Sequence, residues 1–357
     1  MGTRRYTLSM SGAFAGAALL ALTPPSAETF GLSAREARPL PLAGPAVPVQ
    51  RPVDFEVLTY NVHGLPAVLR KSGVAPLEAI GERLRELRES GVHPRIVVLQ
   101  EAFTEEAKAI GRAGGYRYVV DGPARDATLS GAAATLAERQ WWIGEGWGHY
   151  VDSGLQVLSD YPVVSVQRLP FPEGACAGFD CLANKGALIV SVRLPGAGGP
   201  TIDIATSHFN ARGASGASRS RSLAAFAAQA DALASALADR DHPERPLVLA
   251  GDFNVGRDRD RAAAMAGSLA ALGQRCALRN AVDRVERDKM SALAEDVREA
   301  RERNKDLQFW ADGTGDSLRP VQVEAPFGRE QDGSMLSDHI GFSVGYRLVS
   351  DSRSPAT

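Results

Sequence analysis

Short apolar runs rich in β-branched residues recur along the chain and predict strands. These runs occupy residues 55–62, 95–103, 154–159, 162–169, 185–194, 201–209, 246–254 and 339–348. Apolar residues at helical spacing lie between some of them and predict helices over residues 76–90, 104–112, 218–239 and 258–272. Tightly connected strand pairs mixed with strand-to-helix steps are typical of an α/β protein. We therefore expect a four-layer α/β sandwich, with two mixed β-sheets packed face to face and helices on the outer faces.

The N-terminal segment has a different pattern. Arg4 and Arg5 precede an apolar run over residues 8–22, and small residues follow at positions 26 and 27. This arrangement is typical of a secretory signal peptide. A buried N-terminal helix is the alternative, but the proline pair at positions 24 and 25 disfavours it. We predict a cleaved signal peptide over residues 1–27 and a secreted or periplasmic protein.

The remaining chain divides into three parts. Residues 28–53 are rich in Ala and Pro and have no hydrophobic period, which predicts a linker. Residues 54–349 carry the predicted strands and helices and form the expected folded domain, and residues 350–357 read as a disordered tail. No segment supplies the roughly 20 clean apolar residues of a lasting transmembrane helix.

Charge and cysteine content narrow the possibilities further. The 40 basic and 42 acidic residues are interspersed and give a formal net charge of −2. This excludes the strong overall field of a protein that grips nucleic acid by its phosphates, although a local basic groove stays open. Three cysteines are too few for a disulfide scaffold. Cys176 and Cys181 lie five positions apart in a loop-like stretch and could close a small ring, which leaves Cys276 as an odd thiol.

Polar residues gather where the predicted strands end. Taken singly, each is ordinarily a turn, cap or structural residue. Taken together, polar groups at the ends of strands are candidates for one shared site. The candidates are Asn61, Glu101, His208 with Asn210, Asp252 with Asn254, and Asp338 with His339.

The order of these residues resembles the endonuclease/exonuclease/phosphatase superfamily of metal-dependent phosphoesterases, which has the DNase I-like fold. The GDFN motif at 251–254 and the SDH motif at 337–339 are the most specific elements. The segments SGLQVLSDYPVV and NKGALIV agree with the same family. HFNAR, DCLANKG and the leader resemble the secreted bacterial neutral sphingomyelinase-like branch. The resemblance implies that residues 54–349 form a catalytic domain that hydrolyses a phosphodiester by in-line attack of water.

The resemblance also implies roles for single residues. Glu101 would be the principal metal ligand, with Asn61 alongside and Asp338 on the metal side. These hard oxygen donors suit Mg²⁺ or Mn²⁺ rather than Zn²⁺. The metal would act mainly as a Lewis acid and template.

Proton transfer falls to two histidines in this comparison. By analogy with the sphingomyelinase branch, His339 would be the general base and His208 the general acid. Asp252 would position the attacking water, and Asn254 would donate to the phosphate. The family's usual strand before the last motif is altered here, so Asp306 is the first candidate to orient His339 and Asp312 the second. The partner of His208 is not identifiable, and Glu145 is only a guess.

The expected substrate is a phospholipid headgroup at a membrane surface, bound by a monomer. Trp141 and Trp142 suit a membrane interface or a choline group, although they could instead pack between sheet and loop. Lys185 and Asn210 are further candidates for substrate binding. The alternatives are an extracellular or periplasmic nuclease of the DNase I type, an inositol-phosphate or other phosphomonoesterase, and a non-enzymatic secreted binding module.

Overall fold

The computed structural model describes residues 54–65, 76–129, 139–196, 199–288 and 294–350. The predicted signal peptide and linker lie outside these residues, so the division of the chain before residue 54 stays a prediction. Most of the predicted tail also lies outside them, and its first residue, Ser350, is the last residue of a strand. The described residues belong to one compact unit of the chain.

Twelve strands form two six-stranded sheets. The first sheet contains, in spatial order, β11 (Asp316–Phe327), β12 (Gly341–Ser350), β1 (Phe55–Asn61), β2 (Ile96–Gln100), β4 (Gln156–Ser159) and β3 (Tyr118–Asp121). The second contains β5 (Val163–Pro170), β6 (Gly186–Arg193), β7 (Thr201–His208), β8 (Leu247–Asp252), β10 (Asp306–Ala311) and β9 (Arg279–Asn280). Each sheet has one parallel pair at its centre, β1 with β2 and β7 with β8, among antiparallel neighbours.

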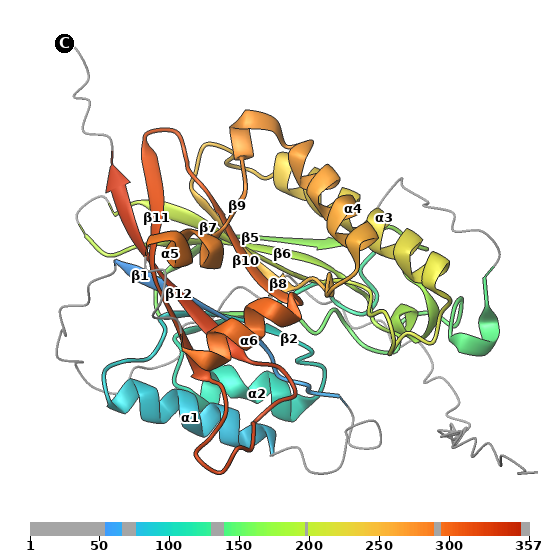
Figure 1. Cartoon of the computed structure of the whole chain (residues 1–357), viewed down its shortest axis with the longest axis horizontal. Helices are drawn as coiled ribbons and strands as arrows, with labels where there is room; N and C mark the ends of the chain where they lie inside the picture. Colours follow the sequence, from blue (N-terminus) through green and yellow to red (C-terminus); the bar gives the residue numbers. More distant parts are fainter. Residues whose placement is uncertain (1–53, 66–75, 130–138, 197–198, 289–293, 351–357) are drawn as a thin grey trace, which may run out of the picture. The chain divides into compact units, whose positions relative to one another are not determined.

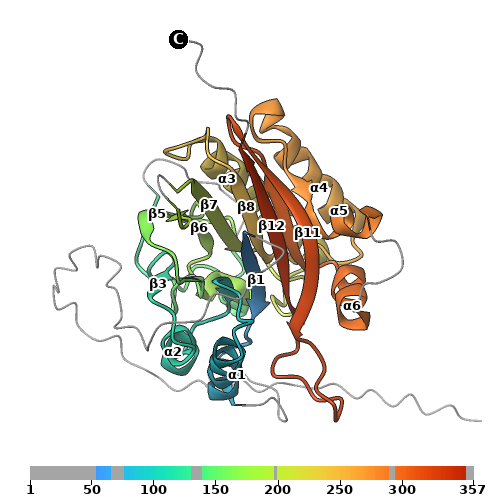
Figure 2. The same cartoon turned by 90° about the vertical axis from the view of Figure 1, so that its left-hand side faces the viewer.

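Helices cover the outer faces of the two sheets (Figures 1 and 2). α1 (Leu77–Glu89) and α2 (Glu105–Ala113) pack on the first sheet, where Ile80 and Ile110 join a buried cluster with strand residues such as Leu99. α3 (Arg219–Ala238) and α4 (Arg259–Ala270) cover the second sheet. α5 (Ala281–Asp288) and α6 (Glu295–Arg303) pack against β10 and β11.

The largest apolar cluster lies between the two sheets. It joins residues of the first sheet, among them Val57, Val98 and Val344, to residues of the second, among them Val190 and Val248. Because each sheet buries one face here and the other under helices, both central strands of each sheet are apolar on both faces. The four-layer α/β sandwich expected from the sequence is confirmed.

All eight predicted apolar runs form strands, with ends that differ by a few residues. The helical patterns likewise become α1 to α4, and the charged stretch before residue 306 forms α5 and α6. The apolar pattern alone misses β3, β9, β10 and β11. β9 is only two residues long, and β11 contains Pro320 and Pro326 and alternates with polar residues along the edge of its sheet.

The three cysteines form one disulfide and one free thiol, as their spacing suggested. Cys176 and Cys181 form a disulfide that closes the loop around the short 3₁₀ helix η2 (Gly178–Leu182). Cys276, at the end of the 3₁₀ helix η3 (Gly273–Cys276), is a buried free thiol. Among the described helices, none has both the length and the apolar character needed to cross a bilayer.

Candidate active site

The two central parallel strand pairs bring four polar residues to one end of the sandwich. Asn61 ends β1 beside the end of β2, and Glu101 follows β2 directly. In the other sheet, the register places His208 opposite Asp252 at the ends of β7 and β8. β10 runs antiparallel to β8 and begins at this point, so Asp306 also lies opposite Asp252. Strand register therefore assembles this part of the site.

Asn61 connects the two sheets at the floor of the site. Its Nδ2 donates to Glu101 Oε1 at 3.0 Å and to Asp252 Oδ2 at 3.0 Å. Its Oδ1 accepts from the backbone N–H of His63 at 3.0 Å, which fixes the orientation of the amide. The sequence suggested Asn61 as a metal ligand beside Glu101. In this arrangement its carbonyl faces the main chain, and its nitrogen holds two carboxylates in place.

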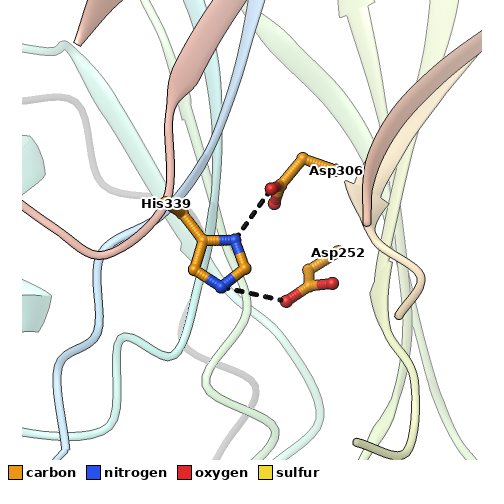
Figure 3. Close-up of side chains that lie close together, drawn as sticks. All are labelled: Asp252, Asp306 and His339. Atoms are coloured by element: carbon orange, nitrogen blue, oxygen red, sulfur yellow. Dashed lines mark hydrogen bonds and ion pairs between the residues drawn. The ribbon is translucent and has the colours of Figure 1, made fainter. Parts of the chain in front are cut away.

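His339 lies between Asp306 and Asp252 (Figure 3). Its Nδ1 is 2.7 Å from Asp306 Oδ2, and its Nε2 is 3.8 Å from Asp252 Oδ2. The loop before β12 is fixed as well, because Ser337 Oγ donates to the carbonyl of Asn61 at 2.7 Å. Burial lowers the pKa of His339, but Asp306 and then Asp252 outweigh it and raise that pKa to about 10.

His208 has the opposite electrostatic setting. Its Nε2 lies 3.7 Å from Asp252 Oδ2 and 3.9 Å from Glu101 Oε1, but burial, reinforced by Lys185, holds its pKa below the ordinary value. In the metal-free protein, His339, the expected base, therefore favours its protonated form. His208, the expected acid, favours its neutral form. A bound cation would lower the pKa of His339, and a phosphate anion would raise that of His208.

The contacts in the structure show which of the candidate acidic partners lie beside His339 and His208. Asp306 makes the contact with His339, whereas Asp312 pairs with Arg279 at 2.6 Å on the surface. Glu145 is not the partner of His208. It forms an ion pair with Arg221 and accepts from the backbone N–H of Gly178.

Glu101 is a partly buried carboxylate, and one of its two oxygens has no hydrogen-bond partner among the described residues. Burial raises its pKa, but the contacts with His63, His208 and other neighbours outweigh burial and leave that pKa below its usual range. Oε1 accepts from Asn61, while Oε2 is buried without a hydrogen-bond partner among the described residues. A free, ionised carboxylate oxygen is the donor that a hard divalent cation takes. The residues here therefore fit a Mg²⁺- or Mn²⁺-type ion.

A second group of donors lies beside this one. Asp252, Asp306 and His339 each offer one ligand atom, and these atoms all lie within 4.8 Å of one another. However, His339 Nδ1 is already engaged by Asp306, so a cation here would compete with the proton that the pair shares. The role of Glu101 as principal ligand stays a prediction.

His63 belongs to the site but was missed in the sequence. Its Nδ1 lies 3.4 Å from Asp338 Oδ1 and 3.6 Å from Glu101 Oε2. Its only sequence signal is its position two residues after Asn61, which no strand or helix pattern marks as functional. Among the described residues other than glycine, His63, Glu101 and Asn254 have positive φ angles of 50°, 58° and 52°, and only Asn304 shares this feature. Backbone in this unfavourable region tends to occur at functional sites.

Three predicted binding residues have their polar atoms engaged by the protein. Asn254 Nδ2 and Lys185 Nζ both donate to the carbonyl of Phe209, at 3.0 Å and 2.9 Å. Lys185 also pairs with Asp180 at 3.3 Å. Asn210 is fully buried and accepts from the backbone of the disulfide loop. In this structure the buried amide of Asn210 holds the loop, and the substrate-binding role expected of it stays a prediction.

The aromatic residues of the insert between β3 and β4, whose described part includes residues 139–152, lie on the surface. Trp141 and Trp142 begin and continue the 3₁₀ helix η1 (Trp141–Ile143) and are 66% and 59% exposed. Trp147, Tyr150 and Phe179 are also exposed. The alternative in which Trp141 and Trp142 pack between sheet and loop is therefore wrong.

Comparisons with known proteins agree with this geometry. The sequence model of the endonuclease/exonuclease/phosphatase family matches residues 58–339, which include the site. The fold is similar to that of a beta toxin variant from Staphylococcus aureus solved with bound magnesium ions, with a TM-score of 0.55, 15% identity and coverage of 82% of this chain and 99% of that one. It is also similar to sphingomyelinase C from Streptomyces griseocarneus, with a TM-score of 0.51, 20% identity and coverage of 82% and 98%.

A eukaryotic protein has the same fold. The human nocturnin catalytic domain, with bound sulfate, gives a TM-score of 0.52 at 15% identity, with coverage of 83% of this chain and 94% of that one. No curated protein sequence matches the chain. At such identities the likenesses concern the fold.

Proposed function

Because the chain belongs to the endonuclease/exonuclease/phosphatase family, we propose that it is a secreted, metal-dependent phosphodiesterase that acts on phospholipid headgroups in the manner of a sphingomyelinase. One observation carries the hydrolytic part of this proposal. His339 and Asp306 form a hydrogen-bonded pair that meets Asp252, while Asn61 ties Asp252 to Glu101. A proton-accepting group and a metal-ligating carboxylate thus share one small site.

The residues divide the reaction between them. Glu101, with Asp338 nearby, would hold a divalent cation, which supplies Lewis-acid stabilisation of charge on the phosphate oxygens. Asp306 holds the ring of His339 so that Nε2 points toward Asp252 and accepts a proton from the attacking water. His208 lies on the other side of Asp252 and delivers a proton to the leaving oxygen. Asn254 would complete the set as a donor to the phosphate through the second N–H of its Nδ2, because the first donates to the carbonyl of Phe209.

The surface of the insert supports a lipid substrate. Five exposed aromatic residues gather on two neighbouring loops, and Trp and Tyr are the side chains that favour the boundary between lipid and water. The predicted signal peptide over residues 1–27 would bring the protein to extracellular lipids. Among the similar folds, one is named a sphingomyelinase.

The test compares substrates with the same protein preparation. The purified chain is incubated with Mg²⁺ or Mn²⁺ and either sphingomyelin vesicles or plasmid DNA, with EDTA as the control. We expect release of the phosphorylated headgroup from sphingomyelin and no release in EDTA. DNA cleavage without lipid hydrolysis would instead identify a nuclease, and hydrolysis that persists in EDTA would refute the metal requirement.

A second prediction concerns the exposed side chains of Trp141 and Trp142. Replacing Trp141 and Trp142 together by Ala should weaken binding to sphingomyelin vesicles about 10-fold or more, because each ring loses its contact with the interface. Turnover of a soluble phosphodiester should stay within about twofold, because both rings are exposed at the surface. Vesicle sedimentation measures the first effect. The control is Val164→Ala, which removes an exposed apolar side chain on another element. Equal losses on both substrates would mean that the rings support the fold.

A further inference from the structure

We propose that His63 is a positioning residue for the divalent cation, and that its imidazole sets the separation of the Glu101 and Asp338 carboxylates. The inference rests on the metal-dependent function proposed above. Glu101 follows β2 and Asp338 precedes β12, so the two acids come from distant parts of the sequence. The same ring nitrogen of His63 lies 3.6 Å from Glu101 Oε2 and 3.4 Å from Asp338 Oδ1.

The ring makes a contact shared between two like charges. Nδ1 faces two carboxylate oxygens, so it carries the hydrogen, because a lone pair at this position would be repelled by both. Both distances exceed the roughly 2.7 to 3.2 Å of a direct N–H···O hydrogen bond, and one hydrogen serves two acceptors. The imidazole therefore acts as a spacer between the two carboxylates. Its N–H attracts both of them, which opposes their mutual repulsion, and the ring keeps them from approaching each other more closely.

The backbone conformation around His63 holds this residue close to Glu101. His63 has a φ of +50°, in the left-handed region, where His, Asn and Asp are the side chains most often tolerated. Its N–H fixes the amide of Asn61, and the next residue, Gly64, runs against Glu101 so closely that a Cβ on Gly64 would lie 2.5 Å from the Glu101 carbonyl oxygen. The segment is thus pressed onto the residue that the ring contacts.

A role in packing alone does not explain the ring. His63 is 8% exposed, and its Nε2 is buried without a hydrogen-bond partner among the described residues. An unpaired buried nitrogen destabilises the folded state, so an apolar side chain would fill this space at lower cost. The polar contacts that distinguish His from such a side chain are those to Glu101 and Asp338.

The experiment measures metal affinity directly. Mn²⁺ is titrated into the full chain and into four variants, and free Mn²⁺ is followed by its electron paramagnetic resonance signal. We expect His63→Ala and His63→Gly to raise the Kd for Mn²⁺ by about 10- to 100-fold, the usual effect of losing a group that orients a ligand. His63→Asn should stay within about threefold of the wild type, because its amide places a donor near the position of Nδ1 and tolerates the positive φ.

The set of variants separates the possible failures. His63→Gly removes the ring and relieves the backbone at once, so a loss shared with His63→Ala comes from the ring. His242→Ala, at an exposed histidine, is the control and should bind Mn²⁺ as the wild type does. An unchanged Kd in His63→Ala, or a Kd for His63→Asn as weak as that of His63→Ala, would overturn the role of His63. Expected Mn²⁺ affinities without any phosphodiester hydrolysis would overturn only the proposed function, and no Mn²⁺ binding by the wild type would overturn both.

Discussion

Glu101→Gln should lower turnover of a phosphodiester at least about 10²-fold while leaving the protein folded. Gln keeps the size of the side chain but removes the negative charge that attracts a divalent cation. Because neighbouring groups hold the pKa of Glu101 below its usual range, its negative charge also contributes to the stability of the metal-free fold. We therefore expect the melting temperature of Glu101→Gln in EDTA to be somewhat lower than that of the wild type, with the unfolding transition still cooperative.

The control for this variant lies four residues away. Glu105→Gln neutralises an exposed carboxylate in the first turn of α2 and should leave turnover unchanged. Steady-state kinetics at several Mg²⁺ concentrations measure both variants. If Glu101→Gln retained wild-type turnover at the same Mg²⁺ concentration, Glu101 would not be the principal ligand.

Removing the imidazole of His339 should have an effect of similar size. His339→Gln should lower kcat/KM by about 10²- to 10⁴-fold, the usual contribution of a general base. Asp306→Asn should lower it less, about 10-fold, because the ring remains but loses its charged partner. Unchanged kcat/KM in His339→Gln would remove this residue from the mechanism.

The pH profile distinguishes orientation from mere stability. Asp306 raises the pKa of His339, which reaches about 10 in the metal-free protein. A general base works in its neutral form, so activity falls as the pH drops below its pKa. Loss of the Asp306 charge lowers that pKa, and the acidic limb of kcat/KM in Asp306→Asn should move to lower pH.

Asp312→Asn is the matched control for the pH profile. Asp312 pairs with Arg279 away from the site and should leave both the height and the limb of the profile unchanged. An acidic limb that stayed in place in Asp306→Asn would mean that this carboxylate does not tune His339. Equal shifts in both variants would indicate a general effect of net charge.

Much of the sandwich could be predicted because its strands are buried on both faces. Runs such as those of β6 and β8 are apolar at nearly every position, and helices with one apolar side, such as α1, separate them. β11 escaped because an edge strand tolerates proline and polar residues that a central strand would not. The segment of β10 departs from the usual family motif and was matched to it only by resemblance. Its apolar run is too short to predict a strand without that resemblance.

The site was partly predictable for a different reason. Polar residues that lie where strands give way to loops are candidates for a shared site, so Asn61, Glu101, His208 and Asp252 could be grouped from the sequence. Side-chain direction could not be read in this way. Asn210 lies two residues after His208, yet its Oδ1 accepts from the backbone N–H of Ala177 in the disulfide loop, which no sequence pattern indicates. His63 carried no pattern, because the sequence does not mark the left-handed backbone conformation in which its ring contacts Glu101 and Asp338.

The left-handed backbone at His63 and Glu101 also bears on how this protein would respond to selection in the laboratory. Non-glycine residues in such conformations cost about 1 to 2 kcal/mol each, a cost that glycine escapes. A library screened only for heat resistance would therefore favour glycine at position 63 and discard the imidazole that contacts Glu101 and Asp338. Selection for thermal stability and selection for catalytic activity would therefore favour different sequences.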